Sequence, residues 1–121
     1  KKYIMKKIFC FDLDNTICKT SGNKYKLSSP KKKIIQLINK LYENGHYIKI
    51  YTARYMGRSN DKISLAKKKG KALTVMQLKK WQLKYHKLIM GKPSFDILID
   101  DKAIFFKKNW PIYLKKKFKI Y

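Results

Sequence analysis

Three short apolar segments, each followed at once by polar residues, constrain the fold of this chain more than any other feature. The segments cover residues 8–11, 47–51 and 97–99, and the polar residues after them are Asp12 to Thr16, Thr52 to Arg54, and Asp100 with Asp101. Short apolar runs with polar boundaries are typical of buried strands. Because helical patterns separate these runs, we expect an α/β fold with a mostly parallel sheet and right-handed crossovers.

The remaining pattern predicts the individual elements. Strands are expected at residues 6–11, 47–51, 87–90 and 96–99, and helices from Pro30 to the Asn44-Gly45 pair, over 61–69 and over 74–85. Ser29 and Thr74 are the expected N-caps, and Gly70 is expected to close the middle helix. The lysines at 115–117 are expected to lie in a solvated tail.

Carboxylates are rare in this chain and gather at the predicted strand ends. Four of the seven acidic residues are Asp12, Asp14, Asp100 and Asp101. Asp12 and Asp14 are two positions apart, so they project to the same side of an extended chain. Like charges at the end of a buried strand need a counter-ion, and carboxylate oxygens suit Mg²⁺. We therefore expect a divalent cation such as Mg²⁺ at Asp12 and Asp14; an ordinary turn after the first strand is the alternative.

The other polar strand-end residues are expected to join the same site. In open α/β sheets the ligand lies outside the carboxyl ends of the strands, which would gather Thr52, Arg54 and Lys92 beside the acids. Only two of the 31 basic residues are Arg, and both follow the second strand. Because the guanidinium fork suits phosphate, Arg54 is interpreted as a substrate ligand, whereas Arg58 stays undecided.

These segments resemble the haloacid dehalogenase superfamily, which consists mostly of phosphate-transferring enzymes on a Rossmann-like sheet. The family pattern is Asp-x-Asp-x-Thr, a strand-end Thr or Ser, a Lys and a strand-end acid pair. Here these are Asp12-Leu13-Asp14-Asn15-Thr16, Thr52, Lys92 and Asp100-Asp101. The longer strings Thr52-Ala53-Arg54, Gly91-Lys92-Pro93 and Ile99-Asp100-Asp101-Lys102-Ala103 also resemble small phosphatase-like proteins associated with bacterial capsule and surface-polysaccharide biosynthesis.

The resemblance implies a Rossmann-like three-layer sandwich with a central, mostly parallel sheet, in one domain over residues 1–121. The connections at 17–29 and 55–73 are too short to hold a cap domain. The crevice should therefore be open, and either the substrate is large or a loop or second subunit covers it. Homo-oligomerisation is accordingly left open.

The resemblance also implies roles for individual residues. Asp12 would be the nucleophile that forms an aspartyl-phosphate, and Asp14 would protonate the leaving group and activate water. Mg²⁺ would be held by Asp12, Asp14 and Asp100, with Asp101 nearby. Phosphate oxygens would be bound by Thr16, Thr52, Arg54 and Lys92.

The expected function is therefore a Mg²⁺-dependent phosphomonoester hydrolase acting on a small phosphorylated metabolite, such as a sugar phosphate of surface-polysaccharide biosynthesis. A polynucleotide or nucleotide phosphatase that uses the basic surface is one alternative. A non-catalytic phosphate-binding or regulatory module is another, although such a module would not need to retain Asp14.

Composition limits the partners and the location. The net charge of +24 comes almost entirely from Lys, which accompanies abundant Ile, Tyr and Asn, as A/T-rich codons would produce. We therefore expect non-specific nucleic-acid binding at low salt rather than a nucleic-acid substrate. No apolar run approaches the roughly 18 residues of a membrane span, and the cytoplasm is the expected location. Cys10 is expected to be buried and Cys18 partly exposed, without a disulfide, and neither His46 nor His86 is expected to be catalytic.

Overall fold

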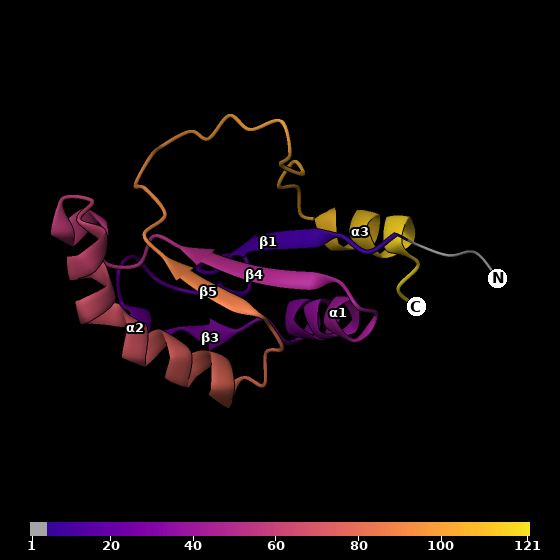
Figure 1. The fold of residues 1–121 in the computed structure, drawn as a ribbon, viewed down its shortest axis with the longest axis horizontal. Helices are drawn as coiled ribbons and strands as arrows, with labels where there is room; N and C mark the ends of the chain where they lie inside the picture. The colour runs from indigo at the N-terminus through magenta and orange to yellow at the C-terminus, as the bar shows by residue number, and fades with distance from the viewer. Residues whose placement is uncertain (1–4) are drawn as a thin grey trace.

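A parallel sheet of three strands forms the centre of the molecule (Figure 1). The computed structural model describes residues 5–121. The strands are β1 (Ile8–Asp12), β4 (Tyr47–Thr52) and β5 (Lys87–Met90), in the order β1-β4-β5. Asp12 is in register with Tyr51, and Tyr51 with Ile89, so all three strands end at the same edge. The predicted parallel α/β sheet is confirmed.

Within residues 5–121, three helices and a small strand pair accompany the sheet. The helices are α1 (Lys32–Glu43), α2 (Ile63–Lys80) and α3 (Trp110–Phe118). β2 (Cys18–Lys19) and β3 (Ser29–Pro30) pair in antiparallel fashion, and two 3-10 turns, η1 (Tyr25–Leu27) and η2 (Gly57–Ser59), lie in the connections. No large cap domain interrupts either connection, as expected. None of the helices within residues 5–121 has both the length and the apolar character needed to cross a bilayer.

All three helices cover one face of the sheet. Ile48 and Ile50 on that face are fully buried, and they share one hydrophobic core with Leu41 of α1, Leu78 of α2 and Leu114 of α3. Successive side chains of a strand point to opposite faces, so the residues next to Ile48 and Ile50 in the sequence lie on the other face of the sheet. That open face presents the exposed residues Ile8, Cys10, Tyr47 and Lys87. The Rossmann-like architecture is therefore present, and residues 5–121 supply one of the two helical layers of the expected sandwich.

Two helix boundaries differ from the prediction. Ser29 and Pro30 are not the N-cap and first residue of α1, because both pair with β2 and the helix begins at Lys32. The helices predicted at 61–69 and 74–85 are one continuous helix, α2. Gly70 lies inside it because the Tyr55 ring packs there: an added Cβ would lie 2.3 Å from Tyr55 Cδ2.

The strand predicted at 96–99 does not form, which is the main correction to the expected fold. Residues 91–109, which we call the arch, leave the sheet after β5 and return at α3 (Figure 1). Ile97 and Ile99 are 81% and 94% exposed. The backbone N–H groups of Gly91 and Lys92 both donate to the carbonyl of Thr52, which holds the chain at the carboxyl edge after β5.

The cysteine expectations were also wrong. Cys18 is fully buried, whereas Cys10 is exposed on the open face of β1, where no second helical layer covers it. The lysines at 115–117 belong to α3 rather than to an unstructured tail, although their side chains are exposed. His46 and His86 precede β4 and β5, at the edge of the sheet opposite the strand ends that were expected to form the site.

His46 generates a pH prediction. It is buried, its Nδ1 accepts the backbone N–H of Lys7 at 3.0 Å, and burial lowers its pKa from 6.5. A histidine whose folded pKa is depressed stabilises the fold at pH values above its unfolded pKa and loses that contribution as the pH falls through the folded value. The free energy of unfolding should therefore fall as the pH drops below about 6.5.

Denaturant titrations between pH 7.5 and 5 would measure this slope. His46→Gln should flatten it, because the glutamine side chain does not titrate. Equal slopes in the parent protein and the His46→Gln variant would contradict the assignment.

Candidate functional site

Asp12 lies at the centre of a polar cluster at the carboxyl edge of the sheet. Its Oδ1 accepts a hydrogen bond from Lys92 Nζ at 3.1 Å, and its Oδ2 accepts one from Thr16 Oγ1 at 3.0 Å. Thr52 ends the neighbouring strand, and its carbonyl holds the backbone of Lys92. Asp12 and Thr16 of the first motif therefore meet Lys92, as the sequence pattern predicted, whereas the buried hydroxyl of Thr52 accepts the backbone N–H of Arg54.

A tight turn after β1 separates the two acids of the first motif. The carbonyl of buried Leu13 accepts the N–H groups of Thr16, Ile17 and Cys18. Asn15 adopts φ 63°, a left-handed conformation that Asn tolerates better than most residues. The extended geometry that would align Asp12 with Asp14 thus ends at Leu13, and the two carboxylates have different partners.

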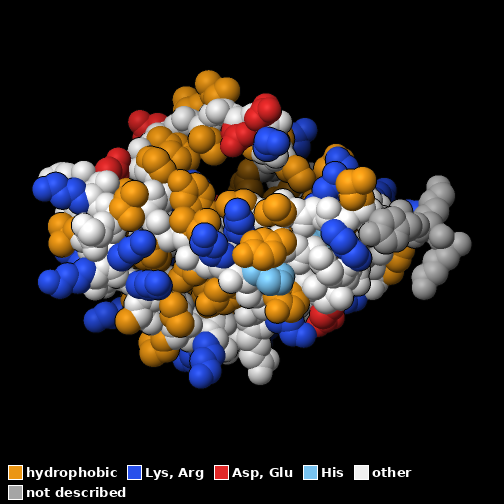
Figure 2. Space-filling view, in the orientation of Figure 1, with side chains coloured by type: hydrophobic (Ala, Val, Ile, Leu, Met, Phe, Trp, Pro, Cys, Tyr) orange, Lys and Arg blue, Asp and Glu red, His pale blue; other side chains and the backbone are white. Residues whose placement is uncertain are grey.

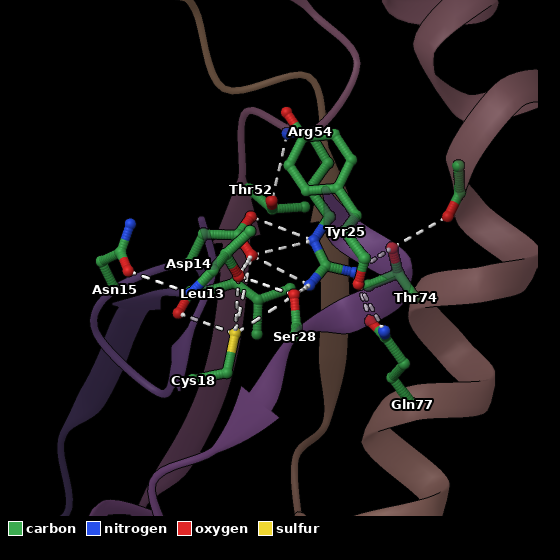
Figure 3. A network of polar contacts seen from close by, with 12 residues as sticks. Leu13, Asp14, Asn15, Cys18, Tyr25, Ser28, Thr52, Arg54, Thr74 and Gln77 are labelled. Carbon is green, nitrogen blue, oxygen red and sulfur yellow. Dashed lines mark hydrogen bonds and ion pairs between the residues drawn. The ribbon is translucent and has the colours of Figure 1, made fainter. Parts of the chain in front are cut away.

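Asp14 forms a bidentate ion pair with Arg54 (Figure 3). Arg54 Nε lies 3.0 Å from Oδ2 of Asp14, and Arg54 Nη2 lies 2.9 Å from Oδ1. The Arg54 side chain is fully buried, while that of Asp14 is 20% exposed. Asp14 Oδ1 also accepts the hydroxyl of Thr20 at 2.5 Å. Both oxygens of Asp14 are therefore occupied by the protein.

The remaining donors of Arg54 bind elements that are distant in sequence. Nη1 donates to Gln77 Oε1 at 2.5 Å and to Thr74 Oγ1 at 3.3 Å, both on α2, and Nη2 donates to Ser28 Oγ at 3.2 Å. Thr74 is thus not an N-cap: its hydroxyl donates to the carbonyl of Gly70 and accepts from Arg54 (Figure 3). The expected role of Arg54 as a substrate ligand does not fit a buried guanidinium whose donors are all engaged.

Cys18 belongs to the same buried network. Its Sγ lies 3.5 Å from Asp14 Oδ1 and 3.7 Å from the carbonyl oxygen of Leu13. Burial raises the pKa of the Cys18 thiol, so it remains a neutral donor at pH 7. Desolvation likewise raises the pKa of the Cys10 thiol on β1. Neither sulfur has the depressed pKa of a nucleophilic thiolate.

An open groove of about 330 Å³ begins beside Lys92. Its lining includes Tyr25, Gly57, Lys92 and Phe95. Arg58 lies over the rings of Tyr25 and Tyr55, with its guanidinium carbon 5.7 Å and 4.8 Å from their centroids. No sequence pattern indicated that Tyr25 would line the groove, because a single aromatic residue in a long connection resembles any partly buried side chain.

Asp100 and Asp101 lie on the arch, away from Asp12. Both are exposed, and Asp100 Oδ1 accepts only a local hydrogen bond, from the backbone N–H of Lys102 at 2.8 Å. Within residues 5–121 no group of three or more His, Cys, Asp or Glu side chains converges on a metal position. Asp12 is paired with Lys92 and Asp14 with Arg54. The side chains that meet at Asp12 in this structure therefore do not form the magnesium site that was expected.

The comparisons with known proteins support the fold. No protein-family model matches the chain, and no curated protein matches it. A crystal structure of a structural-genomics target from Vibrio cholerae is similar, with a TM-score of 0.75 and 24% sequence identity. The match covers 93% of this chain and 98% of that one. The two chains therefore share one fold over nearly their whole length.

The buried ion pair generates a stability prediction. Arg54→Met should destabilise the fold by about 3–5 kcal/mol, because it leaves Asp14, Gln77 and Thr74 without their shared partner. Arg54→Lys should cost less but still more than about 1 kcal/mol, since an ammonium group cannot form the bidentate fork.

Arg58→Lys is the matched control, because Arg58 is exposed: it donates to the carbonyl of Asn23 and lies over the rings of Tyr25 and Tyr55 without being buried. Its free energy of unfolding should stay within about 1 kcal/mol of the parent value. Denaturant unfolding of the three variants measures these differences. Equal effects at positions 54 and 58 would show that the network is not important for stability.

Proposed function

We propose that this protein is a phosphomonoester hydrolase with Asp12 as its nucleophile. The observation that supports this most is the position of Asp12 at the carboxyl edge of the sheet, between Lys92 Nζ and Thr16 Oγ1. The Asp12 side chain is 37% exposed, so an incoming phosphate ester has access to it. Lys92 supplies a cation next to the oxygen that attacks.

The proposed reaction has two steps. First, an Asp12 oxygen bonds to phosphorus while the bond from phosphorus to the leaving oxygen breaks, and that oxygen takes up a proton from solvent water. Second, water attacks phosphorus and returns a proton to the solvent, while the bond from phosphorus to the Asp12 oxygen breaks and releases inorganic phosphate and the Asp12 carboxylate. Lys92 stabilises the negative charge on the phosphoryl oxygens, with the Thr16 hydroxyl as a neighbouring polar group. Asp14 could carry the proton only after releasing contacts to Arg54 and Thr20.

Magnesium remains part of the proposal through the resemblance to the superfamily, in which it neutralises charge on the transferred phosphoryl group. No step is assigned to it, because one chain lacks a ligand set for it. The groove beside Lys92 has room for a ring-sized group, which agrees with a small phosphorylated metabolite such as a sugar phosphate. A cytoplasmic location accompanies this proposal.

Asp12→Asn tests the nucleophile. Asn is nearly isosteric but cannot form the acyl-phosphate, so hydrolysis should fall by about a thousandfold or more while the fold persists. The readout is phosphate release from a panel of phosphorylated metabolites with Mg²⁺, together with the thermal midpoint. Asp61→Asn is the control, because Asp61 lies outside the cluster and accepts only a long contact from the N–H of Ser94, at 3.4 Å. Undiminished turnover by Asp12→Asn would refute the mechanism.

A polynucleotide or nucleotide phosphatase is the second candidate, and the net charge of +24 favours it. A polynucleotide held by several lysines should lose affinity by orders of magnitude between about 50 and 200 mM salt through counter-ion release. A small ester bound at Lys92 should be much less sensitive. The salt dependence of KM on the best substrate therefore separates the two candidates.

A non-catalytic phosphate-binding module is the third candidate, and the separation of Asp100 from Asp12 favours it. Such a protein would bind phosphate esters but release no phosphate from any of them, with or without Mg²⁺. Calorimetric binding without turnover across the panel would establish that reading.

A further inference from the structure

The arch exposes a strand-like apolar segment that pairs with no strand formed by residues 5–121. Phe95, Ile97, Leu98 and Ile99 are 46%, 81%, 56% and 94% exposed. Figure 1 shows the arch rising away from the sheet, and Figure 2 shows a hollow beneath it. Contiguous apolar residues exposed to this degree mark an interaction site.

The outer edge of β1 is a matching surface. Among residues 5–121, β1 pairs with β4 on one side and with no strand on the other, so its outer side presents unpaired backbone N–H and C=O groups. Ile8, 69% exposed, and Cys10 lie on its open face. An unprotected edge strand of this kind accepts a further strand through backbone hydrogen bonds.

Within a single chain, residues 96–100 cannot pair in parallel along the full length of that chain's own β1. In the register that sets Asp100 level with Asp12, Asp96 lies level with Ile8. Lys92 is held at the opposite end, where its N–H donates to the carbonyl of Thr52 at 3.1 Å. Because Tyr51 is level with Asp12 and Tyr47 with Ile8, Thr52 lies five strand positions beyond the level of Ile8. Five positions along a strand correspond to about 16 Å. Four residues from Lys92 to Asp96 reach at most about 14 Å, before any sideways step.

The antiparallel orientation is within reach, but it places Asp100 at the amino end of β1, far from Asp12. A second copy of the chain is not limited in this way. We propose that two copies exchange their arches, so that residues 96–100 of each copy add in parallel to the outer edge of β1 of the other. Asp100 of one copy then lies beside Asp12 of the other, and each site contains residues of both chains.

Charge favours the same pairing. Residues 95–101 contain three acids and no basic residue, in a chain with a net charge of +24. The open face beside β1 carries Lys49 and Lys87, and Lys92 lines the groove. The acidic segment 95–101 and the basic surface around β1 are complementary between two copies, although the rest of the two chains would repel each other. The strand exchange does not depend on the proposed function, whereas the role of Asp100 at Asp12 rests on it.

Disulfide trapping tests the exchange directly. In the proposed register Leu98 is level with Cys10, and adjacent strands lie about 4.8 Å apart, within the Cα range of a disulfide. Leu98→Cys should give a covalent dimer on oxidation, seen on a non-reducing gel, and Cys10→Ser in the same chain should remove that Cys10-linked product. Ile97→Cys is the matched control, since its side chain points to the other face. Static light scattering should give twice the monomer mass without oxidation.

A disulfide within one chain would show that a shortened segment closes on its own β1, and the exchange would be wrong. Absence of a cross-link, or equal dimer yields from Leu98→Cys and Ile97→Cys, would also overturn it. These outcomes are read from gels and need no enzymatic activity.

Complementation tests the shared site. Asp12→Asn and Asp100→Asn chains, each inactive alone, should recover about a quarter of the parent activity when co-expressed, since half of the dimers are mixed and each of these holds one intact site. No recovery, in an active parent protein, would place Asp12 and Asp100 in the same chain or Asp100 outside the site. A cross-linked dimer of an inactive parent protein would instead refute the proposed function and retain the exchange.

Discussion

The ion pair between Asp14 and Arg54 is the interaction on which the arrangement of the site depends. Arg54 follows β4, Asp14 follows β1, and the other partners of the guanidinium lie on α2 and just before β3. A buried guanidinium is costly to desolvate and is tolerated only when its donors are satisfied. The network therefore sets how the turn after β1 sits against α2, and so where Asp12 is presented at the edge of the sheet.

The same network gives Asp12 and Asp14 different roles. Asp14 faces inward and neutralises a buried cation, which leaves Asp12 as the accessible carboxylate, with Lys92 beside it. Two charges that would otherwise repel are thus each balanced by a basic side chain. The sheet has one open face and an outer edge on β1 without a partner strand among residues 5–121. Asp12 and Lys92 lie at the end of that edge strand. Asp100 and Asp101, which were expected beside Asp12, lie on the arch instead.

Several elements could be predicted because local patterns specify them. β5 was expected at Lys87–Met90 and is found there, and the meeting of Asp12 with Lys92 followed from strands that end at one edge of a parallel sheet. Other expectations failed because tertiary contacts override local preference. Gly70 resembles a helix end in the sequence but accommodates the Tyr55 ring inside α2, and Ser29 resembles an N-cap but pairs with β2.

The sequence by itself determined the three strands β1, β4 and β5, the parallel sheet and the meeting of Asp12 with Thr16 and Lys92 at its carboxyl edge. These features depend on apolar periodicity and on strand direction, both of which are local. Only the tertiary structure decided that Arg54 is buried against Asp14 and that Asp100 stands apart from Asp12. The first depends on which side chains lie close enough to satisfy a desolvated guanidinium. The second depends on the distance that four residues can span, and neither quantity is present in a linear pattern.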